Sequence, residues 1–275
     1  MDTKKILIVS AHPEPRSLNG ALTAFAAGEL CRAGHQVCVS DLYAMEWRPA
    51  VGPDDFPGHD PAGRLDVMGA SGRAYAEGRL APEIAAEQEK LLWSDAVILQ
   101  FPMWWFSMPA MLKGWVDRVF THGFGYGTGR VNRARYGDGM LAGRRAMLSV
   151  TIGAAEPSFS SRGVHGRLAD VLFPVQHGLL YYTGMDVLPP FVVWDSLDVE
   201  TSRFATLTEA YGTRLRDLFT ADPVPYRPLS GGDYTRAMEL RPGLEEPGAD
   251  GLAIHLTPAG PRGTGPDRRG AGRAS

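Results

Sequence analysis

Short runs of consecutive apolar residues along the chain alternate with longer segments in which apolar residues recur every three or four positions. Apolar runs of strand length lie at Ile6–Val9 and Ala96–Leu99. Runs this uniform are typical of strands buried on both faces of a parallel sheet. Further strands are expected at Gln36–Ser40, Arg145–Ile152 and Met185–Val193.

The helical pattern occupies the segments between these runs. Helices are predicted over Gly20–Ala33, over Pro82–Trp93, and after Pro109, where Leu112, Trp115, Val116, Val119 and Phe120 form one apolar stripe. Phe204, Leu207, Tyr211, Leu215 and Leu218 mark a closing helix. Strands alternating with helices predict an α/β fold, a doubly wound parallel sheet with helices on both faces. Five strands favour the flavodoxin-like order.

The remaining segments lack a clear period. Residues 45–80 are rich in Pro, Gly and Asp and read as a long excursion, and Gly123–Gly139 is either a mobile lid or a plain surface connection. We divide the chain into a main domain, residues 1–225, a C-terminal arm, 226–257, with one short apolar segment at Gly251–Leu256, and a tail, 258–275, rich in Pro, Gly and Arg and expected to be disordered.

The carboxyl end of the run at Ala96–Leu99 is the first candidate for a binding site. Pro102 and Met103 follow the strand, and then come three consecutive aromatics, Trp104–Phe106. Open α/β sheets bind ligands at this edge, and strand-to-helix loops normally carry turn residues. We therefore favour a flat ligand here, although plain packing under the next helix is the alternative.

The loop after the first strand, S-A-H-P-E-P-R-S-L-N, is the second candidate. It places backbone N–H groups at the start of a helix, an arrangement that binds phosphate, and Ser17 and Asn19 add polar side chains. The loop has neither the G-x-x-x-x-G-K-[ST] nor the G-x-G-x-x-G pattern, which disfavours ATP and a Rossmann-type nicotinamide site. His12 is either a catalytic base or, as we prefer, a cofactor-binding donor.

Composition narrows the function by exclusion. The formal net charge is −3, which gives no reason to expect nucleic acid or anionic lipid as a partner. The only cysteines, Cys31 and Cys38, match neither a metal site nor a redox motif, and they suit a reducing cytoplasm. No apolar run has the length of a signal-peptide core or a membrane span, so we expect no membrane insertion. The spacing of the two cysteines gives no metal site, and we expect no bound metal.

Several motifs together resemble the flavodoxin-like NAD(P)H:quinone oxidoreductases, the family of DT-diaphorase. They include the loop after the first strand, Q-F-P-M-W-W-F-S-M-P-A-M-L-K-G-W-V-D-R-V-F, L-S-V-T-I-G-A, G-V-H-G and F-P-V-Q-H-G-L-L. The likeness extends from about Lys5 to Pro228. It implies a homodimer with a shared site that holds FAD, or FMN in some relatives, and passes a hydride from NADH or NADPH to a quinone in a ping-pong cycle.

The resemblance also assigns site residues by position. Cofactor contacts would come from His12, Ser17, Leu18, Asn19, Pro102, Met103, Trp104, Trp105, Phe106, Thr151, Ile152, Gly153, Ala154, Phe159 and Arg203. Substrate contacts would come from Tyr126, Thr128, His165 and Tyr182. Among these, His165, Tyr126 and Gly153 are the expected catalytic residues.

Three positions depart from the family pattern. Phe159 stands where well-known members have a Tyr that works with the histidine, so His165 would act alone or through water. Thr128 replaces a second substrate-side Tyr, and Trp104 replaces a Gln. Beside the quinone reductase, two alternatives stay open: an azo- or nitro-compound reductase on the same flavin, and a regulatory flavoprotein like the ancillary subunits of potassium-efflux systems.

Overall fold

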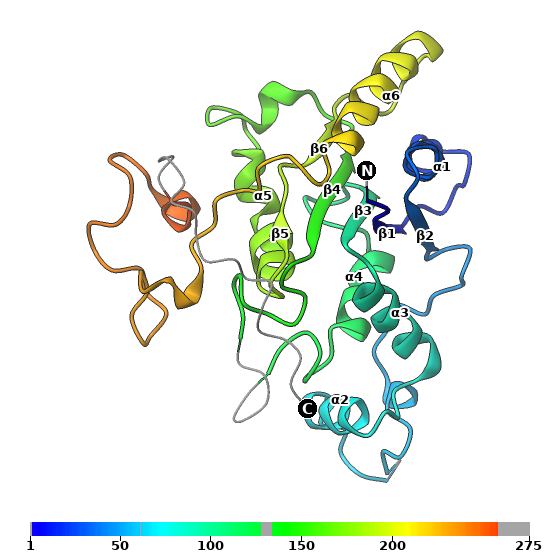
Figure 1. Ribbon diagram of the computed structural model, residues 1–275, viewed down its shortest axis with the longest axis vertical. Coiled ribbons are helices and arrows are strands. Elements are labelled where there is room, and N and C mark those ends of the chain that lie inside the picture. Colours follow the sequence, from blue (N-terminus) through cyan, green and yellow to red (C-terminus); the bar gives the residue numbers. More distant parts are fainter. Residues whose placement is uncertain (1, 61, 128–133, 258–275) are drawn as a thin grey trace.

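A parallel sheet forms the centre of the computed structural model, which describes residues 2–60, 62–127 and 134–257. Its strands are β1 Lys5–Ser10, β2 Gln36–Asp41, β3 Ala96–Pro102, β4 Arg145–Thr151, β5 Asp186–Val187 and β6 Phe191–Val193. The order is β2-β1-β3-β4-β5, with β6 also paired to β4, and every pairing is parallel (Figure 1). This is the expected flavodoxin-like order, and the predicted fold is confirmed.

Helices cover both faces of the sheet because successive strand residues point to opposite sides. Ile6 and Ile8 of β1 face a core completed by α1 Leu18–Arg32 and α6 Thr201–Arg216. Leu7 and Val9 face the other core, which α3 Pro82–Trp93, α4 Ala110–Val119 and α5 Leu168–Val175 complete. The strands β1 and β3 are almost fully buried, which explains their continuous apolar runs.

The predicted fifth strand, Met185–Val193, is wrong as a single element. The structure divides it into β5 and β6, which both pair with β4. Pro189 and Pro190 lie between them and have no amide hydrogen to give to a ladder. After this interruption the chain continues as β6, whose last residue, Val193, pairs with Thr151 at the carboxyl edge of the sheet.

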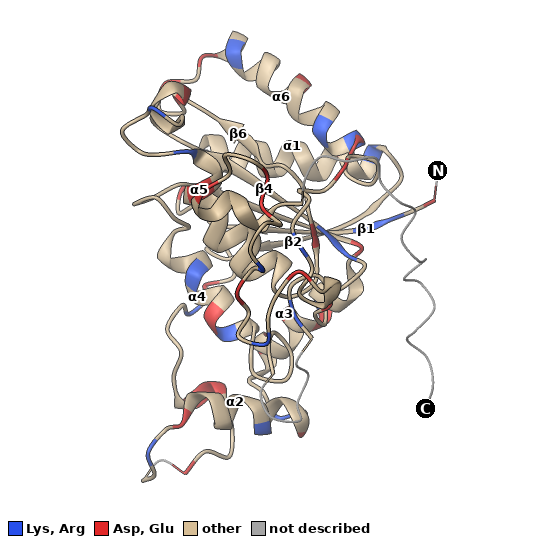
Figure 2. Cartoon of the chain, turned by 90° about the vertical axis from the view of Figure 1, so that its left-hand side faces the viewer, with Lys and Arg blue, Asp and Glu red and all other residues tan. Residues whose placement is uncertain are grey.

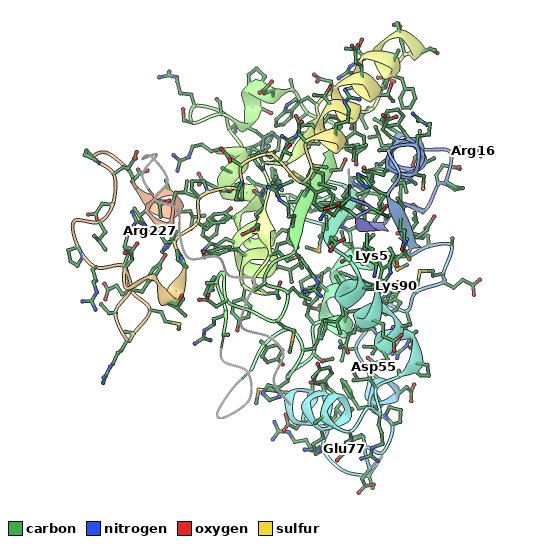
Figure 3. All side chains as sticks on the ribbon, viewed as in Figure 1. Lys5, Arg16, Asp55, Glu77, Lys90 and Arg227 are labelled. Atoms are coloured by element: carbon green, nitrogen blue, oxygen red, sulfur yellow. The ribbon has the colours of Figure 1, made fainter. Side chains whose placement is uncertain are left out.

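The excursion over residues 45–80 contains a helix that the sequence pattern did not predict, α2 Val67–Ala76. Asp66 caps this helix by accepting a hydrogen bond from the Gly69 amide at 3.1 Å. The segment is fixed to the main body through Asp55, whose buried carboxylate accepts hydrogen bonds from Arg118 of α4 at 2.7 and 3.1 Å (Figure 3). Tertiary contacts, rather than local periodicity, therefore hold this segment.

A second unpredicted helix follows β4 along the chain. The α-helix α5 continues directly as a six-residue π-helix, η3 Gln176–Tyr181. Pro174, which cannot donate to the preceding turn, lies just before the change. The wider π turn places His177 so that its ring stacks on Phe173 at 4.4 Å and on Tyr136 at 4.8 Å between ring centroids.

The C-terminal arm packs beside α5 and the π-helix. Its ends are joined by a bridge between Tyr226 and Leu256, and the buried Arg227 donates to the carbonyls of Leu244 and Ile254 and to Asp233 (Figures 1 and 3). The tail expected to be disordered, 258–275, lies outside the described residues.

Lys and Arg positions and Asp and Glu positions are interspersed along the chain (Figure 2). Among the described residues, no helix combines the length and the apolarity needed to cross a bilayer. The same residues include no group of three or more His, Cys, Asp or Glu side chains placed to hold a metal ion.

His177 should make the stability of the protein depend on pH. Burial lowers its pKa from 6.5 to about 4, so the unfolded chain binds a proton more readily between these values. The contribution of neutral His177 is complete above about pH 6.5 and is lost as the pH falls toward 4. We expect the parent to lose about 1–3 kcal/mol more unfolding free energy than His177→Phe between pH 7 and 4. Urea denaturation at both values tests this, and parallel losses in the two proteins would contradict it.

Candidate functional site

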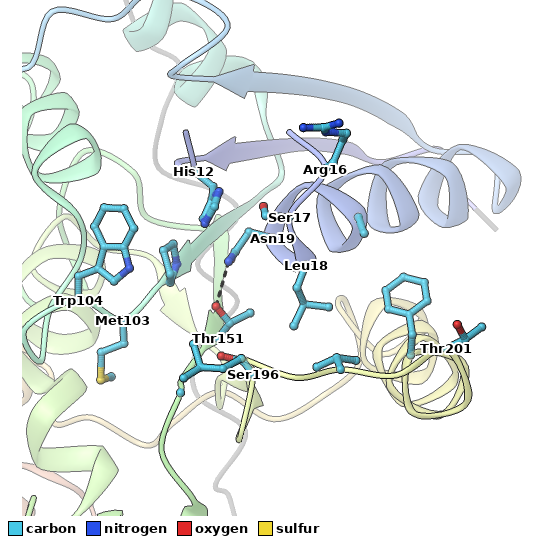
Figure 4. A pocket seen from close by; sticks show the side chains of 16 residues that line it. His12, Arg16, Ser17, Leu18, Asn19, Met103, Trp104, Thr151, Ser196 and Thr201 are labelled. Atoms are coloured by element: carbon cyan, nitrogen blue, oxygen red, sulfur yellow. Dashed lines mark hydrogen bonds between the residues drawn. The ribbon is translucent and has the colours of Figure 1, made fainter. Parts of the chain in front are cut away.

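A cavity of about 740 Å³ opens at the carboxyl edge of the sheet, where the strand order reverses between β1 and β3 (Figure 4). Four segments contribute to it: the loop after β1, the end of β3, the turn after β4 and the loop from β6 to α6. The lining residues are His12, Arg16, Ser17, Leu18, Asn19, Ala21, Pro102, Met103, Trp104, Thr151, Gly153, Ser196, Leu197, Val199, Thr201 and Phe204.

The His12 ring is hydrogen-bonded within the loop after β1. Its Nδ1 lies 3.1 Å from both the amide nitrogen and the carbonyl oxygen of Glu14, so it accepts from the amide in one tautomer and donates to the carbonyl in the other. The Trp104 ring lies 6.1 Å from the His12 ring between centroids, and both side chains line the cavity (Figure 4). In the tautomer whose Nδ1 accepts from Glu14, the Nε2–H is available as a donor on the ring that lines the cavity.

The N-terminus of α1 points its free amides toward the same loop. Ser17 is the N-cap, and its Oγ accepts from the Gly20 amide at 3.2 Å. Gly20 allows the loop to approach the helix closely, because a Cβ there would lie 2.0 Å from the Pro15 carbonyl oxygen. No acidic residue is present in the first turn, so the positive end of the helix dipole stays available to an anion.

The three aromatics after β3 form a strained turn rather than ordinary packing. Trp104 and Ser107 exchange backbone hydrogen bonds of 3.0 and 3.1 Å, and the two central residues, Trp105 and Phe106, have φ values of 50° and 62°. Bulky residues seldom adopt this left-handed conformation, and strain of this kind is concentrated at functional sites. Trp105 is 95% exposed, which argues against the alternative that these rings simply pack in the core.

The turn after β4 offers fewer backbone donors than its sequence suggested. The Ile152 amide donates to the Val193 carbonyl at 2.8 Å, so it is not available to a ligand. No acceptor among the described residues is assigned to the amides of Gly153 and Ala154. Gly153 also lines the cavity, where a Cβ would lie 3.2 Å from Leu197.

The Asn19 side chain is buried, and both of its polar atoms are hydrogen-bonded within the protein. It is 3% exposed, its Nδ2 donates to Thr151 Oγ1 at 2.9 Å, and its Oδ1 accepts from Gln100 Nε2 at 2.9 Å (Figure 4). Asn19 therefore joins the start of α1 to β3 and β4 as well as lining the cavity. Gln100 was not among the predicted site residues.

His165 lies in an aromatic cluster next to the strained turn. Its ring is 5.1 Å from Phe106 and 4.9 Å from Phe159 between centroids, and Phe159 in turn lies 5.5 Å from Trp194. The ring of Phe159 has no hydrogen-bonding group to share with His165. The half-buried His165 therefore lies beside the aromatic turn, but neither it nor Phe106 nor Phe159 is among the residues that line the cavity.

Other predicted residues do not line this cavity. Tyr126 and Tyr182 are near one another, and burial, with a smaller effect from Tyr182, raises the pKa of Tyr126. Arg203 donates instead to the carbonyls of Trp194 and Asp195, at 2.6 and 2.8 Å. Thr128 lies outside the described residues.

The loop from β6 to α6 and the start of α6 contribute lining residues that the sequence reasoning missed, namely Ser196, Leu197 and Val199 from the loop and Thr201 and Phe204 from the helix. Arg16 and Ala21 were missed as well. The available signal was the strand predicted to end at Val193, because parallel strands send their following loops out of the same edge of the sheet.

Comparison with known proteins agrees with this fold. Residues 4–215 match the family model described as "Flavodoxin-like fold". The chain is 48% identical to the ribosyldihydronicotinamide dehydrogenase-like protein traD of Penicillium crustosum, over 84% of this chain and 87% of that protein. It is 36% identical to NAD(P)H dehydrogenase [quinone] 1 of Cavia porcellus, over 82% of each. The crystal structure of a putative quinone reductase from Klebsiella pneumoniae is 48% identical, with a TM-score of 0.88, over 93% of this chain and 100% of that one.

The sheet order and the cavity at its switch point define a protein of the flavodoxin-like class. Within that class, the chain belongs to the NAD(P)H:quinone oxidoreductase family, and it is an oxidoreductase.

Two glycines of α1 should respond in opposite ways to alanine. Gly20→Ala forces the loop after β1 away from the helix, and we expect it to cost about 1–3 kcal/mol of unfolding free energy. Gly28→Ala is the matched control, since its Cβ would meet only the Arg32 side chain at 3.9 Å. That change should stabilise the protein by about 0.5–1 kcal/mol. Equal effects in urea denaturation would show that the loop does not need this close approach.

Proposed function

We propose that the protein binds FAD and uses it to transfer hydride from a reduced nicotinamide co-substrate to quinones, in two-electron steps at one site. One observation carries this proposal. A cavity that combines a helix N-terminus with an exposed, strained aromatic turn suits a ligand with a phosphate part and a flat part. The bound flavin would supply the hydride chemistry, and the protein would supply binding, orientation and electrostatics.

The residues present fit such a group. His12 Nε2, the Ser17 hydroxyl and the first amides of α1 would hold the pyrophosphate, since all are neutral or positive hydrogen-bond donors. Residues Pro102–Phe106 would line the flat ring, with the amides of Gly153 and Ala154 at its polar edge. FMN would use the same groups without the outer part of the cavity near Thr201 and Phe204.

His165 would stabilise negative charge that develops on the ring. Its ring is next to Phe106, and Phe159 leaves it without a phenol partner, so a positive or donating imidazole would carry this interaction alone. Tyr126 and Tyr182 would form the wall against which the nicotinamide or quinone lies, although neither lines the cavity within one chain.

A homodimer would complete such a site. Trp105 and Val164 are 95% and 88% exposed on the side of the cavity where the ring would lie, which leaves apolar surface for a second copy to cover. In an isologous pair, Tyr126 and Tyr182 of one chain could face the cavity of the other. Mass in solution tests this: we expect a dimer, and a fully active monomer would exclude a shared site.

The names of the relatives point to more than one reduced nicotinamide as the hydride donor. One relative is called a ribosyldihydronicotinamide dehydrogenase-like protein and another an NAD(P)H dehydrogenase. Steady-state reduction of a simple benzoquinone by NADH and by NADPH tests the proposal. Parallel double-reciprocal lines are the expected ping-pong pattern, and absence of quinone turnover with both donors would contradict it. Turnover of azo dyes at a far higher kcat/KM than quinones would favour the azoreductase alternative, and co-purification with a membrane transporter would favour the regulatory one.

His165→Ala should slow flavin reduction about tenfold to a few hundredfold, because the interaction it removes is made mainly in the transition state. Flavin content should stay close to that of the parent. Stopped-flow reduction at saturating NAD(P)H measures the rate. Phe159→Tyr is the companion variant, since a phenol beside His165 should leave that rate unchanged or raise it. A His165→Ala protein reduced as fast as the parent would assign the histidine a packing role.

A further inference from the structure

Gln100 is buried beneath the cavity and has no surface exposed to it. It is 0% exposed in the middle of β3, yet it carries a polar side chain in a strand that is otherwise apolar up to that point. Its Nε2 donates to Asn19 Oδ1 at 2.9 Å, and its Oε1 has no partner among the described residues. Such a group is costly to bury, so a role beyond packing needs to be considered.

The hydrogen bonds through Gln100, Asn19 and Thr151 have one favoured direction. Gln100 donates to the Asn19 oxygen, and Asn19 then donates to the Thr151 hydroxyl oxygen at 2.9 Å. The reversed chain would make Gln100 an accepting group and leave its buried N–H groups without acceptors. Orphaned buried donors are rarer than orphaned carbonyl oxygens, which favours the direction described.

This direction determines where the Thr151 hydroxyl hydrogen points. The Thr151 oxygen accepts a hydrogen bond from Asn19, so the hydroxyl hydrogen does not take part in that bond. Among the described residues, no other acceptor for this hydrogen is present. Thr151 lines the cavity, and Figure 4 shows its side chain at the wall between Asn19 and Ser196. The free hydrogen can therefore be donated into the cavity.

We propose that Gln100 is a positioning residue that, through the buried amide of Asn19, holds the Thr151 hydroxyl as a hydrogen-bond donor to the bound flavin. This inference rests on the proposed function and adds a donor that comes from a side chain rather than from the backbone. In this arrangement Asn19 accepts from Gln100 and donates to Thr151, so the orientation of the Gln100 amide determines that of the Asn19 amide. The three residues lie on three different segments, so their order depends on the fold as a whole.

The test measures the flavin dissociation constant and midpoint potential of the full-length protein. Gln100→Met keeps the approximate volume and removes the donor, and Thr151→Val keeps the shape and removes the hydroxyl. Each should weaken flavin binding about tenfold, the effect of one lost hydrogen bond to a ligand. Each should also make the midpoint potential more negative, because a donor to the electron-rich ring is lost.

Non-additivity distinguishes positioning from separate structural damage. If Gln100 acts through Thr151, the double variant should bind flavin no more weakly than Thr151→Val alone. Thr151→Ser, which keeps the hydroxyl, should bind within about twofold of the parent, a small fraction of one hydrogen bond. Gln88→Met is the matched control: Gln88 is also a buried glutamine, donating to the Val119 carbonyl at 2.8 Å and to Thr121 at 3.0 Å, remote from the cavity lining.

Four results would overturn the inference. Additive losses in the double variant would show that Gln100 and Thr151 act independently. A Gln100→Met protein with the flavin affinity and midpoint potential of the parent would show that Gln100 has no positioning role. Equal flavin binding by Thr151→Val and Thr151→Ser would show that the Thr151 hydroxyl is not a donor to the flavin. This comparison tests the proposed donor even if Gln100→Met fails to fold. A parent protein that binds no flavin would overturn the proposed function together with this inference, whereas the other three leave that function standing.

Discussion

The structure depends on the parallel pairing of three buried strands, β1, β3 and β4, whose carboxyl ends lie at one edge of the sheet. Ser10 of β1 pairs with Gln100 of β3, and Gln100 pairs with Ser149 of β4. Parallel strands in this register send all their following loops out of the same edge of the sheet. Since the chain then turns in opposite directions after β1 and β3, the loops separate and leave a crevice between them.

The chemistry of the site follows from this constraint. Each loop contributes a different kind of group to the crevice: a helix N-terminus after β1, exposed aromatic rings after β3, and a glycine-containing turn after β4. The buried amides of Gln100 and Asn19 connect the three segments beneath it. A buried floor and a wall of mixed polar and apolar groups, with the Trp104 ring on it, are suited to holding a flat cofactor, and the positive end of a helix dipole is suited to its phosphates.

Much of the fold could be predicted because its strands are buried on both faces and therefore read as uniform apolar runs. The same local reasoning failed where distant contacts decide the structure. Asp55 and Arg118 fix the segment that contains α2, although they are far apart in the sequence. For the cavity, the loop at His12 and the aromatic loop at Trp104 could be singled out from unusual residues in loops, whereas the left-handed backbone of Trp105 could not. Gln100 could not be singled out either, since a single polar residue in an apolar strand does not reveal which partners the fold brings to it.

The cavity at the strand ends is the site that we propose for a flavin. The most direct measurement is the absorption spectrum of the purified protein together with the mass of any flavin released on denaturation. We expect flavin bands and close to one FAD per chain, with Gly20→Ala losing occupancy because its loop is displaced from α1. A colourless protein that takes up neither FAD nor FMN when either is added would contradict the account.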